Sequence, residues 1–198
     1  MDISKYKLWT EFDWVAQLSK EENNLNAYFE ELEKHLDLPN EDDLIYAGLK
    51  SKKMSEEEFN IREEISEYFF EEENELDYSG YDLINKTSAS AFYFDIGKIS
   101  TDLCMDAGFS TNLNYQSMLS WLMVSGRAMS LYMDFLQLNK DEFPELKKAI
   151  LKSELAMLNV LVGILGKMHG DIGSEKIENY LFRLYKLREN LIELRFAI

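Results

Sequence analysis

The sequence predicts an all-α protein: a helical bundle of six to seven helices, with the long C-terminal helices forming the core. Only two prolines and nine glycines occur in 198 residues, so helix breakers are few. Apolar residues recur at helical spacing along most of the chain, and alternation of period two is rare. Hydrophobic residues make up 46% of the chain and aromatic residues 13%, which indicates a folded core despite a net charge of −16.

The N-terminal helices follow from stripes of apolar residues and from stop signals. The first helical region covers about residues 8–36, with a break expected near Asn23-Asn24. Its two stripes are Leu8, Phe12, Val15 and Leu18, and then Leu25, Tyr28, Phe29, Leu32 and Leu36. The segment 37–40 is a stop, and a short helix is expected from Glu41. Ser55 with Glu58 forms a capping-box pattern, which predicts a helix to about Glu71.

A loop is expected over residues 74–85, and longer helices follow it. The first covers Ser88–Asp106 and ends at Gly108 as a C-terminal cap. The second covers Asn112–Leu138. Its expected apolar face consists of Tyr115, Met118, Leu119, Leu122, Gly126, Met129, Met133 and Leu136.

Two further helices complete the bundle. One opens at Asp141, with Pro144 in its first turn, and ends near Met168 before His169-Gly170. The last is expected to be capped by Ser174 and to run to Phe196. Its stripe includes Ile177, Leu181, Leu184, Leu191 and Leu194. Three glycines within these helices, Gly126, Gly163 and Gly166, are interpreted as sites of close helix packing.

Acidic residues are concentrated in one half of the chain. The first 80 residues carry 23 Asp and Glu against 8 Lys and Arg, whereas the remaining 118 carry 14 against 13. We therefore expect a single all-α domain over residues 1–198. It has an acidic helical part at about 1–77 and a near-neutral bundle at about 88–198.

Composition argues against several classes of function. The chain has a pI near 4.5 and no stripe of Lys and Arg, so direct nucleic-acid binding and binding to an anionic membrane are disfavoured. The single cysteine, Cys104, excludes an internal disulfide. The apolar stretch 156–168 is too short to span a bilayer, and no signal peptide is recognised. A soluble, cytoplasmic protein is expected.

The sequence contains no motif that is typical of a particular catalytic reaction. The two histidines lack the Glu-x-x-His spacing of carboxylate-bridged metal bundles. Glu31 with His35 is interpreted as a solvated ion pair near a helix end. Asp102 and Asp106 flank Cys104 and would blunt its nucleophilicity. Phosphate-binding and dinucleotide-binding loops are absent, and so is a calcium loop. The expectation is a non-enzyme that needs no cofactor and no metal.

Two polar residues on apolar helices need partners. Arg127 is interpreted as a structural ion pair with Asp95 or Asp102, and an anionic ligand remains an alternative. Asn159 lies in the most apolar helix and, if buried, needs a hydrogen-bond partner.

The densest acidic segment, residues 56–77, carries eleven acids and one base, Arg62. On a helix its stripe of Ile61, Ile65 and Phe69 faces inward, while the acids face water. Like charges at i and i+4 oppose helix stability, and aromatics among carboxylates suit a basic, partly apolar partner. The predicted partner-binding residues are Glu56, Glu57, Phe59, Glu63, Glu64, Glu67, Phe70 and Glu71.

The leading hypothesis is a non-enzymatic, immunity-like inhibitor that blocks a basic surface of another protein, such as a nuclease or toxin. The alternative is a helical ligand-binding domain with a pocket near Arg127. The pocket would lie between the C-terminal helices, and its lining would consist of Met118, Trp121, Met123, Arg127, Met129 and Met133. An enzyme with converging carboxylates and a self-associating scaffold, a homo-oligomer, are retained as further hypotheses.

Overall fold

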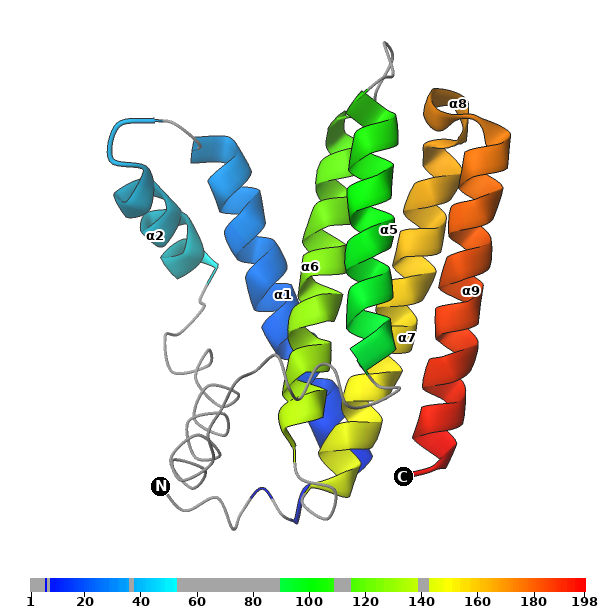
Figure 1. The fold of residues 1–198 in the computed structure, drawn as a ribbon. Helices are drawn as coiled ribbons and strands as arrows, with labels where there is room; N and C mark the ends of the chain where they lie inside the picture. The colour runs from blue at the N-terminus through cyan, green and yellow to red at the C-terminus, as the bar shows by residue number, and fades with distance from the viewer. Residues whose placement is uncertain (1–5, 7, 36–37, 53–89, 109–114, 139–142) are drawn as a thin grey trace, which may run out of the picture. The chain divides into compact units, whose positions relative to one another are not determined.

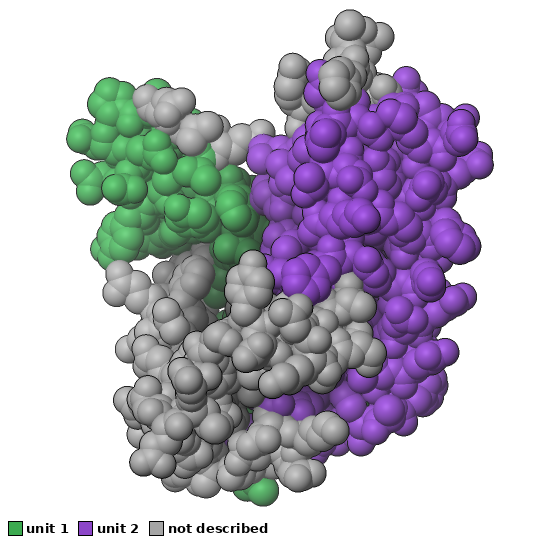
Figure 2. Space-filling model, viewed as in Figure 1, with its two compact units in different colours: residues 1–76 green, residues 77–198 purple. Residues whose placement is uncertain are grey.

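The computed structural model describes residues 6, 8–35, 38–52, 90–108, 115–138 and 143–198 (Figure 1). These residues form six helices of eleven residues or more and one single-turn helix, and they contain no strand. The all-α class is therefore confirmed. The chain divides into two compact units, residues 1–76 and 77–198 (Figure 2). Their boundary lies where the acidic half of the sequence ends.

Unit 1 contains α1 (Glu11–His35) and α2 (Glu41–Ser51). Helix α1 begins with a reciprocal capping box. The Thr10 amide donates to Oδ2 of Asp13 at 2.9 Å, and the Asp13 amide donates to Oγ1 of Thr10 at 3.3 Å. The expected break near Asn23-Asn24 is wrong, because α1 is continuous and Asn24 is a buried residue within it.

Ion pairs join α2 to α1. Lys52, just after α2, places its Nζ 2.8 Å from Oε2 of Glu30 and 3.0 Å from Oε1 of Glu31. Glu31 is buried and also pairs with Lys34 at 2.7 Å. The predicted pair of Glu31 and His35 is present, at 3.7 Å between Oε2 and Nε2, but Glu31 is buried and the pair is therefore not a solvated one. The Glu31 carboxylate is therefore fixed where the two helices pack together.

Unit 2 is an up-down-up-down bundle of four long helices (Figure 1). They are α5 (Ser90–Gly108), α6 (Tyr115–Gln137), α7 (Pro144–Lys167) and α9 (Ser174–Phe196). The single turn α8 (His169–Ile172) joins the last two. Helices α6 and α7 pack together, as do α7 and α9, and α5 contacts both α6 and α9. The predicted core of long C-terminal helices is confirmed for this unit.

The interior of unit 2 is filled by large side chains. Trp121 has no exposed surface, and its Nε1 donates a hydrogen bond to Oγ of Ser100 at 3.0 Å. The fully enclosed neighbours, each with no more than 2% of its surface exposed, include Ile96, Ile99, Leu103, Tyr132, Ile150, Leu158, Leu161 and Leu165. Burial of such side chains contributes roughly 1.5–3 kcal/mol each, which makes this layer the main source of stability in the unit.

Several details of the long helices differ from the sequence predictions. The expected apolar face of α6 is partly wrong: Met118 is buried, but Leu119 is 52% exposed and Leu122 is 44% exposed. Asn159 is exposed and needs no buried partner. The predicted cap at Ser174 is also wrong. Gly173 precedes α9 with φ of 96°, and no side chain caps the helix.

The glycine prediction is wrong as well. A Cβ added at Gly126, Gly163 or Gly166 would meet no atom within 4 Å. All three residues are exposed, so they do not mediate close helix packing.

Helix α7 is long and apolar enough to cross a membrane by length and composition, with a mean hydropathy of 1.6 over its most apolar window. Half of that window is buried inside the unit. The central helix of a soluble bundle has the same properties, so this feature is weak evidence for a membrane span. Pro144 occupies the first turn of α7, as predicted.

Candidate functional site

The predicted partner-binding residues, Glu56, Glu57, Phe59, Glu63, Glu64, Glu67, Phe70 and Glu71, lie outside the described residues. Their role remains a prediction from the sequence. The described part of unit 1 nevertheless shows what kind of surface adjoins them in the sequence.

Helix α2 combines exposed acids with exposed apolar side chains. Asp42 and Asp43 lie in its first turn and are exposed. Leu44 is 37% exposed and Tyr46 is 55% exposed, whereas Ile45 is buried. Acids near a helix N-terminus are favoured by the helix dipole, which accounts for the carboxylates. The dipole does not account for an exposed Tyr and Leu beside them.

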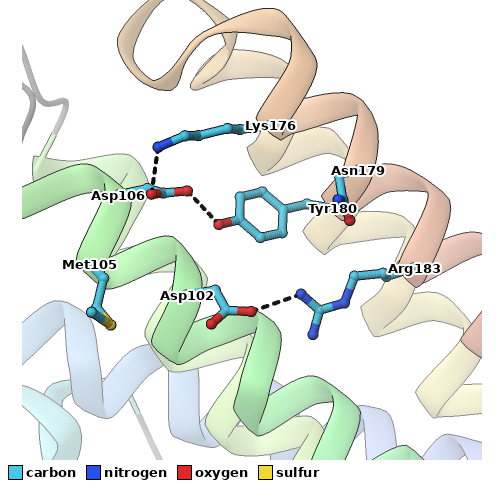
Figure 3. Close-up of a pocket in the computed structure, with 7 residues that line it drawn as sticks. All are labelled: Asp102, Met105, Asp106, Lys176, Asn179, Tyr180 and Arg183. Atoms are coloured by element: carbon cyan, nitrogen blue, oxygen red, sulfur yellow. Dashed lines mark hydrogen bonds and ion pairs between the residues drawn. The ribbon is translucent and has the colours of Figure 1, made fainter.

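A second candidate site is an open cleft of about 320 Å³ between α5 and α9 (Figure 3). Two ion pairs cross it. Nη1 of Arg183 lies 2.9 Å from Oδ2 of Asp102, and Nζ of Lys176 lies 2.6 Å from Oδ1 of Asp106. The remaining lining comes from Met105, Asn179 and Tyr180.

The charged groups in this cleft neutralise one another. The Tyr180 hydroxyl donates to Oδ2 of Asp106 at 2.6 Å. The contacts from Lys176 and Tyr180 lower the pKa of Asp106, so this carboxylate stays ionised. Burial, together with the bond to Asp106, raises the pKa of Tyr180 above the usual range of a phenol. These contacts of Asp102 and Asp106 with Lys176, Tyr180 and Arg183 hold α5 and α9 together, and we call them the α5–α9 clamp.

The sequence missed this clamp. The sequence suggested Asp95 or Asp102 as the partner of Arg127, but Asp102 pairs with Arg183 of α9. A signal was present: Asp102 and Asp106 are four residues apart, and Lys176 and Arg183 are seven apart, so each pair lies on one helix face. These two faces lie against each other because α5 and α9 are neighbours in the bundle, and the sequence does not show which helices become neighbours.

The residues of the alternative ligand pocket all lie on α6, and they differ in burial. Trp121 is fully buried and hydrogen-bonded, whereas Arg127, Met129 and Met133 are half-buried on α6. The methyl group of Met129 lies 3.4 Å from where a Cβ would stand at Gly97 of α5. Trp121 and Met129 thus pack against α5, and the cleft in Figure 3 is lined by other residues.

An unexpected acid lies in the interior of the bundle. Glu154 of α7 has no exposed surface, and neither of its carboxyl oxygens has a hydrogen-bond partner. Burial raises its pKa well above the usual range, although Arg127 lowers it and Asp134 raises it further. Arg127 therefore acts electrostatically on α7, although the sequence had suggested a partner on α5.

The described residues contain no group of three or more His, Cys, Asp or Glu side chains placed to hold a metal ion. Cys104 is half-buried, and its Sγ lies 3.9 Å from Sδ of Met118. A thiol in such surroundings behaves as a small packed side chain.

Comparison with known proteins gave no match to a family model, to a curated protein or to a solved structure.

Proposed function

We propose that the chain is a non-enzymatic protein-binding protein whose acidic N-terminal unit occupies a basic surface of a partner. One observation carries the proposal: the change in charge falls at the boundary between the two compact units. Residues 1–76 contain 22 acids and 8 bases, against 15 and 13 in residues 77–198. A charge excess confined to one unit gives that unit its own electrostatic field, which steers association with an oppositely charged surface.

The surface of α2 supports the same proposal. Charges alone mainly set the rate of encounter, whereas buried aromatic and aliphatic anchors supply most of the binding energy. Tyr46 and Leu44 offer such anchors beside Asp42 and Asp43. The predicted set at residues 56–71 has the same composition, with Phe59 and Phe70 among glutamates.

The partner class follows from this chemistry. Proteins that handle nucleic acids expose Lys and Arg where phosphates bind, and carboxylates placed there compete with phosphate by charge complementarity. A nuclease or a toxin with such a surface is therefore the proposed target, and the chain would act as its inhibitor or immunity-like protein within the cytoplasm.

The experiment is affinity capture of basic proteins from a lysate of the native cell at 50 mM and 500 mM salt. The wild-type chain is compared with two variants of equal charge change. Glu63→Lys/Glu67→Lys reverses two acids of the predicted surface, and Asp95→Lys/Glu175→Lys reverses two exposed acids of unit 2. We expect capture to be lost at high salt and in the first variant alone.

Capture that is indifferent to salt, or that both variants reduce equally, would contradict the proposal. For a captured nuclease, the same three proteins are then assayed for inhibition of its activity. Tyr46→Ala provides the test of the apolar anchor. It should weaken binding by about fivefold or more, because truncation of an anchor residue costs over about 1 kcal/mol.

A further inference from the structure

Helix α9 carries two apolar seams, and the bundle uses one of them. The inner seam repeats at alternating spacings of three and four residues, the pattern that keeps side chains along one line of a helix. Its members are Ile177, Tyr180, Leu184, Leu187 and Leu191, and each is at most 5% exposed. They pack into the interior of unit 2.

The outer seam has the same spacing on the side of α9 that is turned away from the core. It consists of Glu178, Phe182, Tyr185, Glu189, Ile192 and Phe196. Phe182 is 68% exposed, Tyr185 is 49% exposed and Phe196 is 86% exposed, while Ile192 is half-buried. Single exposed aromatics are ordinary on a protein surface, but three along one heptad line form the kind of seam that pairs with another helix.

We propose that this outer seam is an interface between two copies of the chain, in which α9 packs antiparallel against α9 of the second copy. A seam from residue 178 to 196 is about 27 Å long, enough for several layers of paired side chains. In an isologous pair each contact occurs twice. The seam read from residue 178 to 196 must therefore be complementary to the same seam read from 196 to 178.

The order of residues satisfies that requirement. Reversal about the midpoint places Phe182 opposite Ile192 and Tyr185 opposite Glu189. The outermost layers place Glu178 opposite Phe196, at ends that remain open to water. Each central layer then joins a phenol that donates a hydrogen bond to a carboxylate that accepts it. The layers on either side of the centre are apolar.

A parallel pair is disfavoured by the same residues. It would place Glu189 against its own counterpart and Glu178 against its own counterpart, and like charges that face each other oppose pairing. Lys186 and Arg188 border the central layers of the antiparallel pair, so Glu189 there lies among basic groups as well as beside the Tyr185 hydroxyl.

Salt distinguishes this interface from the docking surface of the N-terminal unit. Two copies each carry a net charge of −16 and repel each other at low ionic strength. Self-association should therefore strengthen as salt is added, whereas binding to a basic partner should weaken. The two proposals rest on different residues, so either one stands if the other fails.

Sedimentation velocity of the full-length chain between 1 and 500 μM, in 300 mM NaCl, tests the inference. Wild-type protein should shift from monomer to dimer across this range. Tyr185→Glu should raise the dissociation constant by at least about tenfold, because it places two glutamates opposite each other in both central layers. Leu119→Glu adds the same charge at a side chain of similar exposure on α6, and should leave the dissociation constant unchanged.

The double variant Tyr185→Glu/Glu189→Lys is the decisive measurement. It forms two opposite-charge layers in the antiparallel pair and should restore dimerisation, whereas a parallel pair would gain only like-charge layers. Circular dichroism confirms that each variant is folded. Wild-type protein that remains monomeric throughout, an unchanged dissociation constant in Tyr185→Glu, or a double variant that stays monomeric would each overturn the inference.

Discussion

Glu154 is the residue whose environment departs furthest from that of an ordinary surface carboxyl. It lies on α7 with no exposed surface and without a hydrogen bond to either oxygen, and Asp134 of α6 adds a second negative charge nearby. An ionised carboxylate is strongly disfavoured in such surroundings unless it is paired, so the group holds its proton above the usual pKa of a glutamate.

The raised pKa makes stability depend on pH in a definite direction. Between the pKa of Glu154 in the unfolded chain and its higher pKa in the folded chain, the folded state binds more protons. The free energy of unfolding therefore falls as pH rises through this window. Glu154→Gln removes the effect, because the amide has no charge to bury. We expect the variant to exceed wild type by about 1–3 kcal/mol at pH 8, and by little at pH 4.5.

Urea denaturation followed by circular dichroism at several pH values between 4.5 and 8 measures this difference. Glu175→Gln on α9 is the matched control, because Glu175 is exposed and its replacement should change the free energy of unfolding by no more than about 0.5 kcal/mol. A gap between wild type and Glu154→Gln that shrinks as pH rises would show that the folded state prefers the ionised carboxylate.

The burial of Glu154 could have been predicted from its helical spacing to neighbouring leucines. Glu154 lies three residues after Leu151 and four before Leu158, on the stripe that becomes the buried face of α7. Asn159 lies in the most apolar stretch and would need a hydrogen-bond partner if it were buried, yet it is exposed. Helical spacing from the nearest leucines, applied to every polar residue, distinguishes the two.

At the scale of elements, helix positions could be predicted well and helix orientations less well. The starts of α2 and α7 and the end of α9 lie close to their expected residues, because stops, prolines and polar turns mark them. Helix α6 shows the limit. Its only charged residues are Arg127 and Asp134, so apolar side chains surround the helix and no period identifies the inner face.

Exposed glycines within helices provide a prediction at this scale. Gly163 is an exposed residue within α7, and an added methyl group there would meet no atom within 4 Å. Alanine loses less conformational freedom than glycine when a helix forms. We expect Gly163→Ala to increase the free energy of unfolding by about 0.5–1 kcal/mol, measured by urea denaturation.

Gly48 of α2 is the matched control with the opposite sign. A Cβ there would collide with the side chain of Glu31, which is buried and fixed by Lys34 and Lys52. Gly48→Ala should therefore lower the stability of unit 1 despite the better helix propensity of alanine. If Gly163→Ala also destabilised the protein, the glycine would have a packing role that the geometry of α7 does not provide.

At the scale of the whole molecule, charge and structure divide the chain at the same place. The charge count identified an acidic part ending near residue 77, and the boundary of the compact units falls between residues 76 and 77. Clusters that join distant segments, such as the Asp102–Arg183 pair, could not be predicted, because they depend on which helices become neighbours. The sequence gives the composition of the acidic segment, but it does not identify the protein that this segment is proposed to bind.

The uneven charge predicts that the two units respond differently to salt. Repulsion among the 22 acids of unit 1 opposes its folding and is screened by added ions, whereas the charges of unit 2 nearly balance. Raising NaCl from 20 to 300 mM should stabilise unit 1 by about 1 kcal/mol, which corresponds to about 4–8 °C in melting temperature for a unit of this size. Unit 2 should change little.

Tryptophan positions allow the two units to be measured separately. Trp9 and Trp14 belong to unit 1, whereas Trp121 belongs to unit 2. Fluorescence of Trp121→Phe therefore reports unit 1, and fluorescence of Trp9→Phe/Trp14→Phe reports unit 2. A melting temperature of unit 1 that falls steadily with salt from the lowest ionic strengths would mean that native ion pairs, such as those of Glu31, outweigh the repulsion. Equal shifts in both units would mean that the excess charge does not act within unit 1 alone.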